Sequence, residues 1–169
     1  KSYIKHIRNN EINKILKTGF KASSNFKRIS DVDIIIICVP TPLGIHNEPD
    51  LSFINGTLQN ISLYLKLGQL LILESTTYPG TTDEILVSFI KSLKINKLIL
   101  GENFFVGYSP EREDPGNKDF STKTIPKVVS GFTKNCLELT DKLYQKVVDK
   151  TIPVSSPKVA EMTKILENI

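Results

Sequence analysis

Four consecutive isoleucines at residues 34–37, within "DVDIIIICVP", constrain the fold more than any other stretch of the sequence. A continuous run of β-branched residues is typical of a strand that is buried on both faces of a parallel sheet. Pro40 and Pro42 follow the run and end it, because proline has no N–H to donate to a sheet. We therefore expect a buried parallel strand whose carboxyl end lies next to Pro40.

Apolar runs and helix-like segments alternate along the rest of the chain. Further strands are predicted at 19–23 ("GFKAS"), 69–75 ("QLLILES"), 103–109 ("NFFVGYS"), 127–131 ("KVVSG") and 151–155 ("TIPVS"). Helices are predicted at about 52–65, 81–93 and 133–148, and a closing helix is predicted to begin at Pro157, the position in the first turn that proline favours. This alternation predicts an α/β fold with a parallel sheet.

Composition limits the classes of protein that the chain can belong to. With 169 residues, 40% of them hydrophobic and 24% charged, it is typical of one soluble globular domain. Its apolar runs are far shorter than the roughly 20 residues of a membrane helix, so we expect a cytoplasmic protein without a membrane partner. The net charge of +4 comes from scattered basic residues, which favours a small anionic ligand over nucleic acid. Cys38 and Cys136 have no metal-binding spacing, so we expect no metal and two reduced cysteines that serve packing.

Polar loops follow three of the predicted strands. Their sequences are "CVPTPLG", "ESTTYPGTT" and "SPEREDPGN", and each is rich in hydroxyls or carboxylates. Any one of them can be an ordinary turn, since Pro, Gly, Ser and Thr favour turns. Parallel sheets bind their ligands beyond the carboxyl ends of the strands, where these three loops would meet. Their succession along one edge therefore favours a composite binding site.

These three loops, together with "IPKVVSG" and "SPKVAEMTKILEN", resemble the UDP-glucose/GDP-mannose dehydrogenase family. The "YPGTT" and "PEREDPGN" forms are most similar to the branch of UDP-N-acetylglucosamine and UDP-N-acetylmannosamine 6-dehydrogenases. The resemblance implies oxidation of the sugar C6 alcohol to a carboxylate in two NAD-dependent steps, through an aldehyde held as a cysteine thiohemiacetal and then a thioester. It implies NAD as cofactor, a UDP-sugar as substrate, an enzyme of the UDP-N-acetyl-D-glucosamine 6-dehydrogenase type, and a homo-oligomeric parent enzyme.

The resemblance also implies roles for residues of the strand-end loops. Thr41 matches a threonine that lies near the cofactor and helps to hold a catalytic water, and Pro40 lies beside it. Glu111 matches the glutamate that acts with this threonine and lies beside the sugar. Glu74 and Ser75 are expected on the cofactor side. Two readings stay open: Thr41 can simply end the strand, and residues 112–114, which include Arg112 as a candidate substrate ligand, can form a solvated turn.

In the closing helix, Lys164 and Asn168 are four residues apart and so point from one face, with Glu161 on the same side. The resemblance implies that Lys164 and Asn168 bind substrate and stabilise negative charge on the oxygen at C6. Donors are needed there because charge builds on oxygen before hydride leaves. The alternative is a surface pair of Glu161 and Lys164.

Two features of the family are missing from these residues. No G-x-G-x-x-G run is present, since Gly19 is the first glycine and stands alone, and no glycine-rich segment carries a cysteine. We therefore expect an internal fragment that is inactive alone, with residues 1–154 as the latter part of the NAD-binding domain and 155–169 as the start of the central helix. The sheet would be a partial Rossmann-like, doubly wound parallel sheet without its first two strands, which leaves residues 34–38 at an apolar edge.

Two other functions stay open. The first is a non-catalytic remnant that binds sugar nucleotides or regulates. The second is an α/β dehydrogenase of another substrate class, such as a hydroxyacid or 6-phosphogluconate-type enzyme, which "PEREDPGN" does not support.

Overall fold

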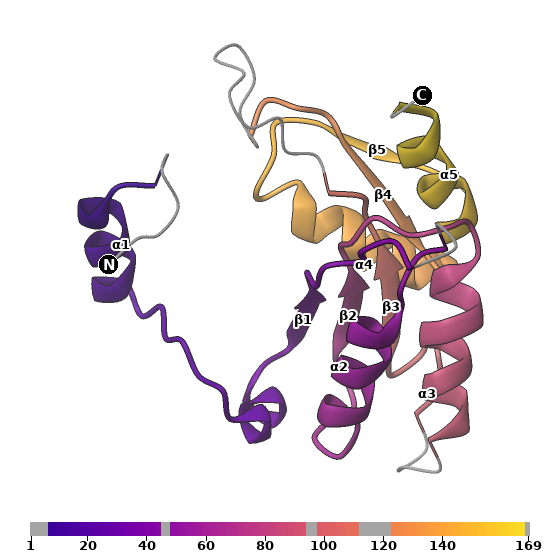
Figure 1. The fold of residues 1–169 in the computed structure, drawn as a ribbon, viewed down its shortest axis with the longest axis horizontal. Helices are drawn as coiled ribbons and strands as arrows, with labels where there is room; N and C mark the ends of the chain where they lie inside the picture. The colour runs from indigo at the N-terminus through magenta and orange to yellow at the C-terminus, as the bar shows by residue number, and fades with distance from the viewer. Residues whose placement is uncertain (1–6, 45–47, 94–97, 112–122, 168–169) are drawn as a thin grey trace.

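The fold is a five-stranded sheet with helices on both faces (Figure 1). The computed structural model describes residues 7–44, 48–93, 98–111 and 123–167. The strands lie in the sheet in chain order: β1 (Ile34–Ile37), β2 (Leu70–Leu73), β3 (Phe105–Tyr108), β4 (Lys127–Gly131) and β5 (Thr151–Pro153). β1, β2 and β3 are mutually parallel, whereas β4 is antiparallel to β3 and β5 is parallel to β4. The predicted α/β class is confirmed, and the sheet is mostly parallel rather than wholly so.

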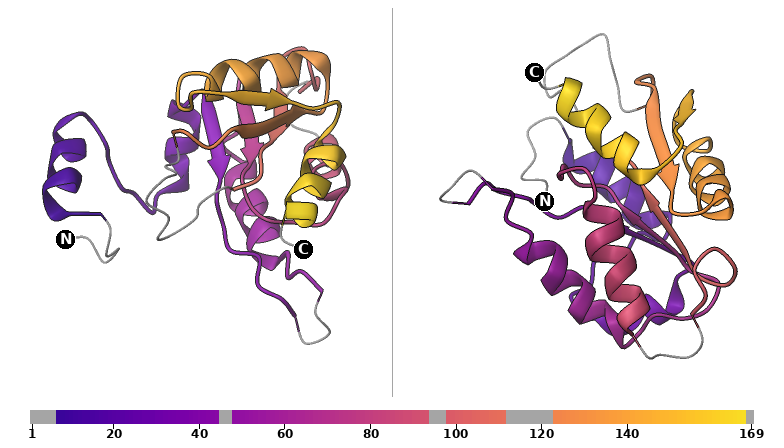
Figure 2. Two further views of the ribbon diagram at one scale, coloured as in Figure 1. Left: turned by 90° about the horizontal axis from the view of Figure 1, so that it is seen from above. Right: turned by 90° about the vertical axis from the view of Figure 1, so that its right-hand side faces the viewer.

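The helices divide between the two faces of the sheet. They are α1 (Asn9–Lys17), the 3-10 helix η1 (Phe26–Asp31), α2 (Ser52–Ser62), the π-helical η2 (Thr82–Val87) continuing into α3 (Ser88–Ser92), α4 (Lys134–Tyr144) and α5 (Pro157–Glu167). The main core joins the sheet to α2, η2, α3 and α5, while a smaller cluster joins the other face to α4. Figure 2 shows α4 on the side of the sheet opposite α2. Strand β2, between β1 and β3, is consequently buried at every residue.

Strand β1 is only half as buried as the isoleucine run predicts. Ile35 and Ile37 are in the core, but Ile34 and Ile36 are 40% and 43% exposed. Among the described residues, β1 is an edge strand that pairs with β2. Because α4 packs over β2 to β5, the second face of β1 is left open. The prediction of burial on both faces is wrong for this reason.

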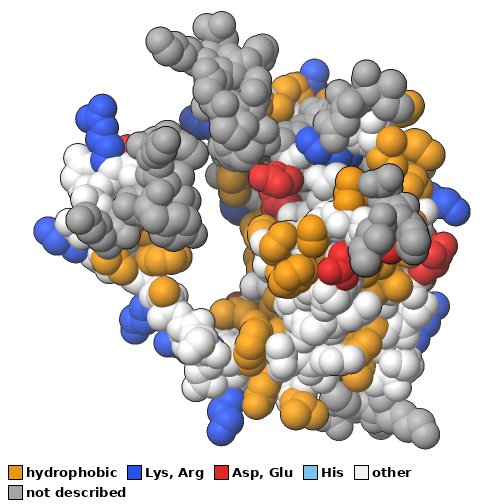
Figure 3. All heavy atoms as spheres, in the orientation of Figure 1, with side chains coloured by type: hydrophobic (Ala, Val, Ile, Leu, Met, Phe, Trp, Pro, Cys, Tyr) orange, Lys and Arg blue, Asp and Glu red, His pale blue; other side chains and the backbone are white. Residues whose placement is uncertain are grey.

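The segment before η1 forms no strand, so the prediction of a strand at residues 19–23 is also wrong. Residues 18–25 are exposed, and no strand in the part of the chain that the structure describes lies beside them to complete a backbone ladder. Gly19, with a φ of +101°, ends α1 in the conformation that glycine favours after a helix. α1 has no buried side chain and stands apart from the sheet (Figure 1). Hydrophobic side chains gather on the surface of the sheet domain that faces it (Figure 3).

No helix among the described residues is long and apolar enough to span a membrane.

Candidate functional site

The three polar loops meet at the carboxyl ends of β1, β2 and β3. A cavity of about 310 Å³ lies there, lined by Cys38, Val39, Pro40, Glu74 and Glu111. Each of the three loops contributes to it, because the carboxyl ends of neighbouring parallel strands share one edge. The structure therefore brings Pro40, Glu74 and the exposed Glu111 together. Neither Thr41 nor Lys164 is among the lining residues.

Two hydroxyls join the loop after β1 to the loop after β2. The Thr41 Oγ1 donates a hydrogen bond to the Thr76 carbonyl, and the Ser75 Oγ donates one to the Val39 carbonyl at 2.8 Å. Ser75 is buried, so its hydroxyl serves the protein's own backbone. Both side chains fix the shape of the cavity rim, and the Thr41 oxygen keeps the capacity to accept a further hydrogen bond.

Glu74 is held from two sides by residues that the sequence did not suggest. The Lys127 ammonium pairs with Oε1 of Glu74, and the Tyr144 hydroxyl donates to Oε2. Burial raises the pKa of Tyr144 far above its usual range, and the Glu74 carboxylate raises it further, so the phenol stays protonated and can donate. One signal was available in the sequence, namely a lysine at the start of the apolar run "KVVSG".

Cys38 opens into the cavity instead of packing inside the protein. It follows β1 on the strand's exposed side, so the prediction of a packing role is wrong for this cysteine. Partial burial raises the pKa of its thiol, and the Glu74 and Glu111 carboxylates raise it further while Lys127 lowers it. Cys136 is buried in α4, where its Sγ accepts from the Val106 amide, so the packing role is confirmed there.

Glu161 lies in the core and not beside Lys164 on the surface. Its carboxylate is fully buried and accepts hydrogen bonds from the Gly80 and Thr82 amides and from the Thr82 hydroxyl. It caps the start of η2, where unpaired N–H groups favour a negative charge. The alternative of a surface pair between Glu161 and Lys164 is therefore wrong, because α5 packs Glu161 against the start of η2. Lys164 is partly buried in α5.

Arg112 and Asn168 lie outside the described residues.

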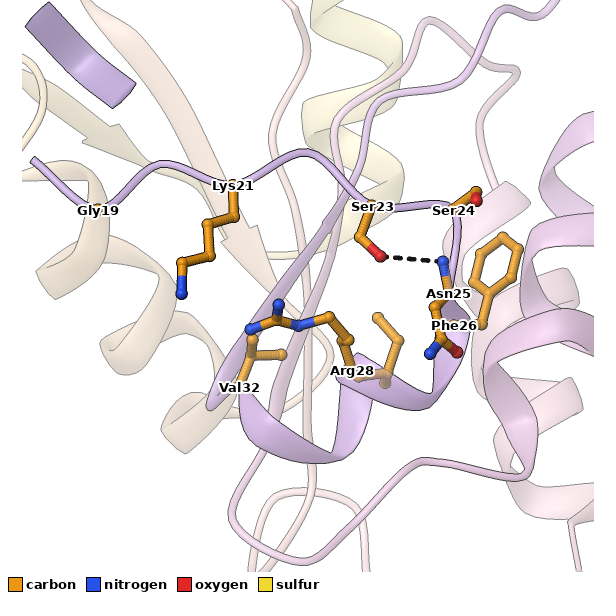
Figure 4. A pocket seen from close by; sticks show the side chains of 9 residues that line it. Gly19, Lys21, Ser23, Ser24, Asn25, Phe26, Arg28 and Val32 are labelled. Carbon is orange, nitrogen blue, oxygen red and sulfur yellow. Dashed lines mark hydrogen bonds between the residues drawn. The ribbon is translucent and has the colours of Figure 1, made fainter. Parts of the chain in front are cut away.

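A second cavity, of about 400 Å³, lies at the opposite end of β1. Figure 4 shows it between η1 and the segment before it, with Lys21 extending from the segment and Arg28 from the helix. The Ser23 hydroxyl accepts there from the Asn25 amide. This cavity precedes β1, and ligands of parallel sheets bind at the other end of the strands. We therefore take the cavity at the carboxyl ends as the candidate site.

The residues at the carboxyl edge fit one end of a dinucleotide better than its middle. A pyrophosphate binds to free N–H groups at a helix N-terminus. The N-terminus of α2 is occupied by the Asp50 carboxylate, which accepts from the Ser52 amide at 2.8 Å, and that of η2 by Glu161. The cavity beside Pro40 and Glu74 offers room for a ring, so these residues suit the nicotinamide end.

A mostly parallel sheet with helices on both faces and a polar cavity at its carboxyl edge defines a Rossmann-type nucleotide-binding protein. The sequence model of the "UDP-glucose/GDP-mannose dehydrogenase family, NAD binding domain" matches residues 4–148 of this chain. The chain therefore belongs to this family, as its motifs indicate, and NAD is the cofactor of this domain.

Known relatives support the same family. The chain is 41% identical over 164 residues to Protein CapL of Staphylococcus aureus, covering 95% of this chain and 38% of that protein. It is 41% identical over 145 residues to the UDP-N-acetyl-D-glucosamine 6-dehydrogenase of Pseudomonas aeruginosa, covering 85% and 34%. The solved UDP-D-ManNAc dehydrogenase of Pyrococcus horikoshii superposes with a TM-score of 0.83 at 28% identity, covering 96% and 39%. The chain thus spans between a third and two fifths of the length of these relatives.

Proposed function

We propose that this chain serves in an NAD-dependent UDP-N-acetylhexosamine 6-dehydrogenase of the UDP-N-acetyl-D-glucosamine type. Residues 1–154 would form the latter part of its NAD-binding domain, and 155–169 the start of the central helix. The enzyme would oxidise the C6 alcohol of the sugar to a carboxylate in two hydride transfers. The observation that carries this proposal is the meeting of Pro40, Glu74 and Glu111 at one cavity in a chain of this family.

Glu111 is proposed as the proton acceptor for the C6 hydroxyl, acting through a water that Thr41 helps to hold. Its exposed carboxylate at the cavity can reach a sugar in the cleft. Lys164 and Asn168 would bind the substrate and donate hydrogen bonds to the oxygen on which charge builds. Pro40, Thr41, Glu74 and Ser75 would shape the cofactor side, where NAD, when bound, supplies the hydride acceptor.

The second oxidation needs a cysteine nucleophile, and neither cysteine of this chain suits that role. Cys136 is buried, and the raised pKa of Cys38 leaves it mostly as the unreactive thiol at neutral pH. We therefore propose that the thioester cysteine and the pyrophosphate cradle come from segments other than these residues, and that this chain is inactive alone.

A chimaera tests this proposal directly. The chain would replace the matching segment of the Pseudomonas aeruginosa relative, and NADH formation would be followed with UDP-N-acetylglucosamine, UDP-N-acetylmannosamine and UDP-glucose. We expect NADH from a UDP-N-acetylhexosamine with the chimaera and none with the isolated chain. Activity with UDP-glucose alone would contradict the substrate class. Binding of UDP-sugars without NADH in the chimaera would favour a non-catalytic sugar-nucleotide-binding role.

The role of Lys164 has its own test in that chimaera. Lys164→Ala should lower kcat by about a hundredfold or more with a smaller change in KM, because an oxyanion donor acts mainly in the transition state. Lys158→Ala, an exposed lysine of the same helix, is the matched control. A change confined to KM would make Lys164 a binding residue only.

A further inference from the structure

Lys127 joins two loops and a helix at the edge of the candidate site. It is the first residue of β4, and it is buried. Besides its ion pair with Glu74, its Nζ donates to the Pro110 carbonyl at 3.1 Å and lies 5.1 Å from the centre of the Tyr144 ring. Pro110 directly precedes Glu111. A single ammonium therefore connects the loop after β2 to the residue before the proposed base.

This arrangement is a costly way to stabilise a fold. The side chains of Lys127 and Glu74 are only 8% and 19% exposed, so both charges have lost most of their water. Well-packed apolar residues of similar volume often stabilise a protein as well as such a buried pair does. The pair does something that apolar residues would not do, which is to hold one carbonyl and one carboxylate at fixed positions.

The loop after β3 is anchored up to the residue that Lys127 holds. The Ser109 amide donates to the Leu73 carbonyl at 3.1 Å, and the Ser109 hydroxyl donates to the Val128 carbonyl at 2.7 Å. Lys127 continues this series at Pro110. Glu111 is the next residue, and its side chain lines the cavity beside Glu74 and Cys38.

We propose that Lys127 is a positioning residue, whose bridge between Glu74 and the Pro110 carbonyl holds the Glu111 carboxylate at the cavity. Glu74 is then the anchor of this bridge as much as a wall of the cofactor side. Tyr144 completes the anchor, because its hydroxyl occupies the second oxygen of Glu74. The catalytic meaning of this placement rests on the function proposed above, but the placement itself does not.

Cys38 provides a reporter of where Glu111 lies. The charges of Glu74, Lys127 and Glu111 shift the pKa of its thiol, and the thiol in turn raises the pKa of Tyr144. Because the Glu111 carboxylate disfavours the thiolate, Glu111→Gln should speed alkylation of Cys38 by about twofold or more at a pH below the thiol pKa. This factor exists only while the carboxylate is held near Cys38.

We call the Glu111 factor the rate of Cys38 alkylation with Gln at position 111 divided by the rate with Glu there. The experiment measures this factor in different backgrounds, by timed iodoacetamide labelling and peptide mass spectrometry on the purified chain. We expect the factor in the wild type and in Lys127→Arg, which keeps a cation and its donors, and a factor near one in Lys127→Met. Persistence of the full factor in Lys127→Met would overturn the proposal, as would its loss in Lys127→Arg. Buried Cys136 is the internal control, because it becomes labelled only when the chain unfolds.

If Lys127→Met does not fold, Glu74→Gln replaces it. This variant removes the charge that anchors Lys127 with little change of shape. The amount by which the Glu111 factor exceeds one should then fall to less than half of its wild-type value. An unchanged factor in Glu74→Gln would then overturn the proposal. The labelling needs neither NAD nor a sugar, so its failure is distinguishable from a failure of the chimaera to form NADH.

Discussion

Replacing Glu161 by alanine should destabilise the chain strongly, although Glu161 is one charged residue among many. The carboxylate is fully buried and accepts from two backbone amides, those of Gly80 and Thr82, and from the Thr82 hydroxyl. Glu161→Ala leaves both amides without an acceptor, since the η2 backbone cannot turn to find another. A buried polar group left unpaired costs about 1–3 kcal/mol, so the two amides together should cost about 2–6 kcal/mol.

Thermal melting and urea denaturation, both followed by circular dichroism, measure this loss. For a domain of this size each kcal/mol corresponds to about 2–4 °C in Tm, so we expect a decrease of about 6–12 °C for a loss of about 3 kcal/mol. Glu161→Gln keeps one accepting oxygen and should lie between the wild type and Glu161→Ala. Glu138→Ala is the control, because Glu138 is an exposed helical glutamate paired with Lys142. Equal losses in Glu161→Ala and Glu138→Ala would refute the reasoning.

Three further predictions concern packing, pH and association. Gly131→Ala should lower the free energy of unfolding by about 3 kcal/mol or more in urea denaturation, because a Cβ there would lie 2.0 Å from the Leu137 amide nitrogen. Gly56→Ala is the control and should stabilise α2, because its Cβ would have nothing within 4 Å. Equal effects of the two substitutions would contradict this. Burial raises the pKa of Asp83 and leaves one of its oxygens without a hydrogen-bond partner, so Asp83→Asn should stabilise the chain at neutral pH. That gain should vanish as the pH falls below the pKa of an unfolded aspartate, where both states are protonated, and a gain independent of pH would exclude the charge as its cause. The apolar edge at β1 should let the chain associate with itself. Ile36→Lys on the open face of β1 should reduce this concentration-dependent association in analytical ultracentrifugation relative to Ile36→Val. Equal association of the two variants would show that the edge plays no part in it.

The positions of most elements follow from local signals in the sequence. α5 begins at Pro157 as predicted, because the fixed φ of proline suits the first turn of a helix. The apolar runs at β2 and β4 became fully buried strands. The family, too, could be read from short motifs, since these loops are contiguous in the sequence.

The two wrong predictions about strands share one cause. A strand exists only where a neighbour accepts its hydrogen bonds, and a face is buried only where another element covers it. Residues 19–23 have no such neighbour, and β1 lacks a helix over one face. Composition and periodicity show which segments can form strands. Whether a segment pairs with a neighbouring strand, and whether a helix covers its face, depends on the whole sheet.

The candidate site divides in the same way. That Pro40, Glu74 and Glu111 meet could be inferred from the sequence, because the ends of parallel strands share an edge regardless of the side chains involved. That Lys127 and Tyr144 hold Glu74 could not, since the antiparallel β4 and the end of α4 reach this edge only through the topology of the sheet. The sequence by itself determined most of the elements, the family and the residues at the strand ends, through interactions among neighbours in the chain. Only the tertiary structure decided which distant charges are paired and buried, because burial and pairing depend on elements that the sequence places far apart.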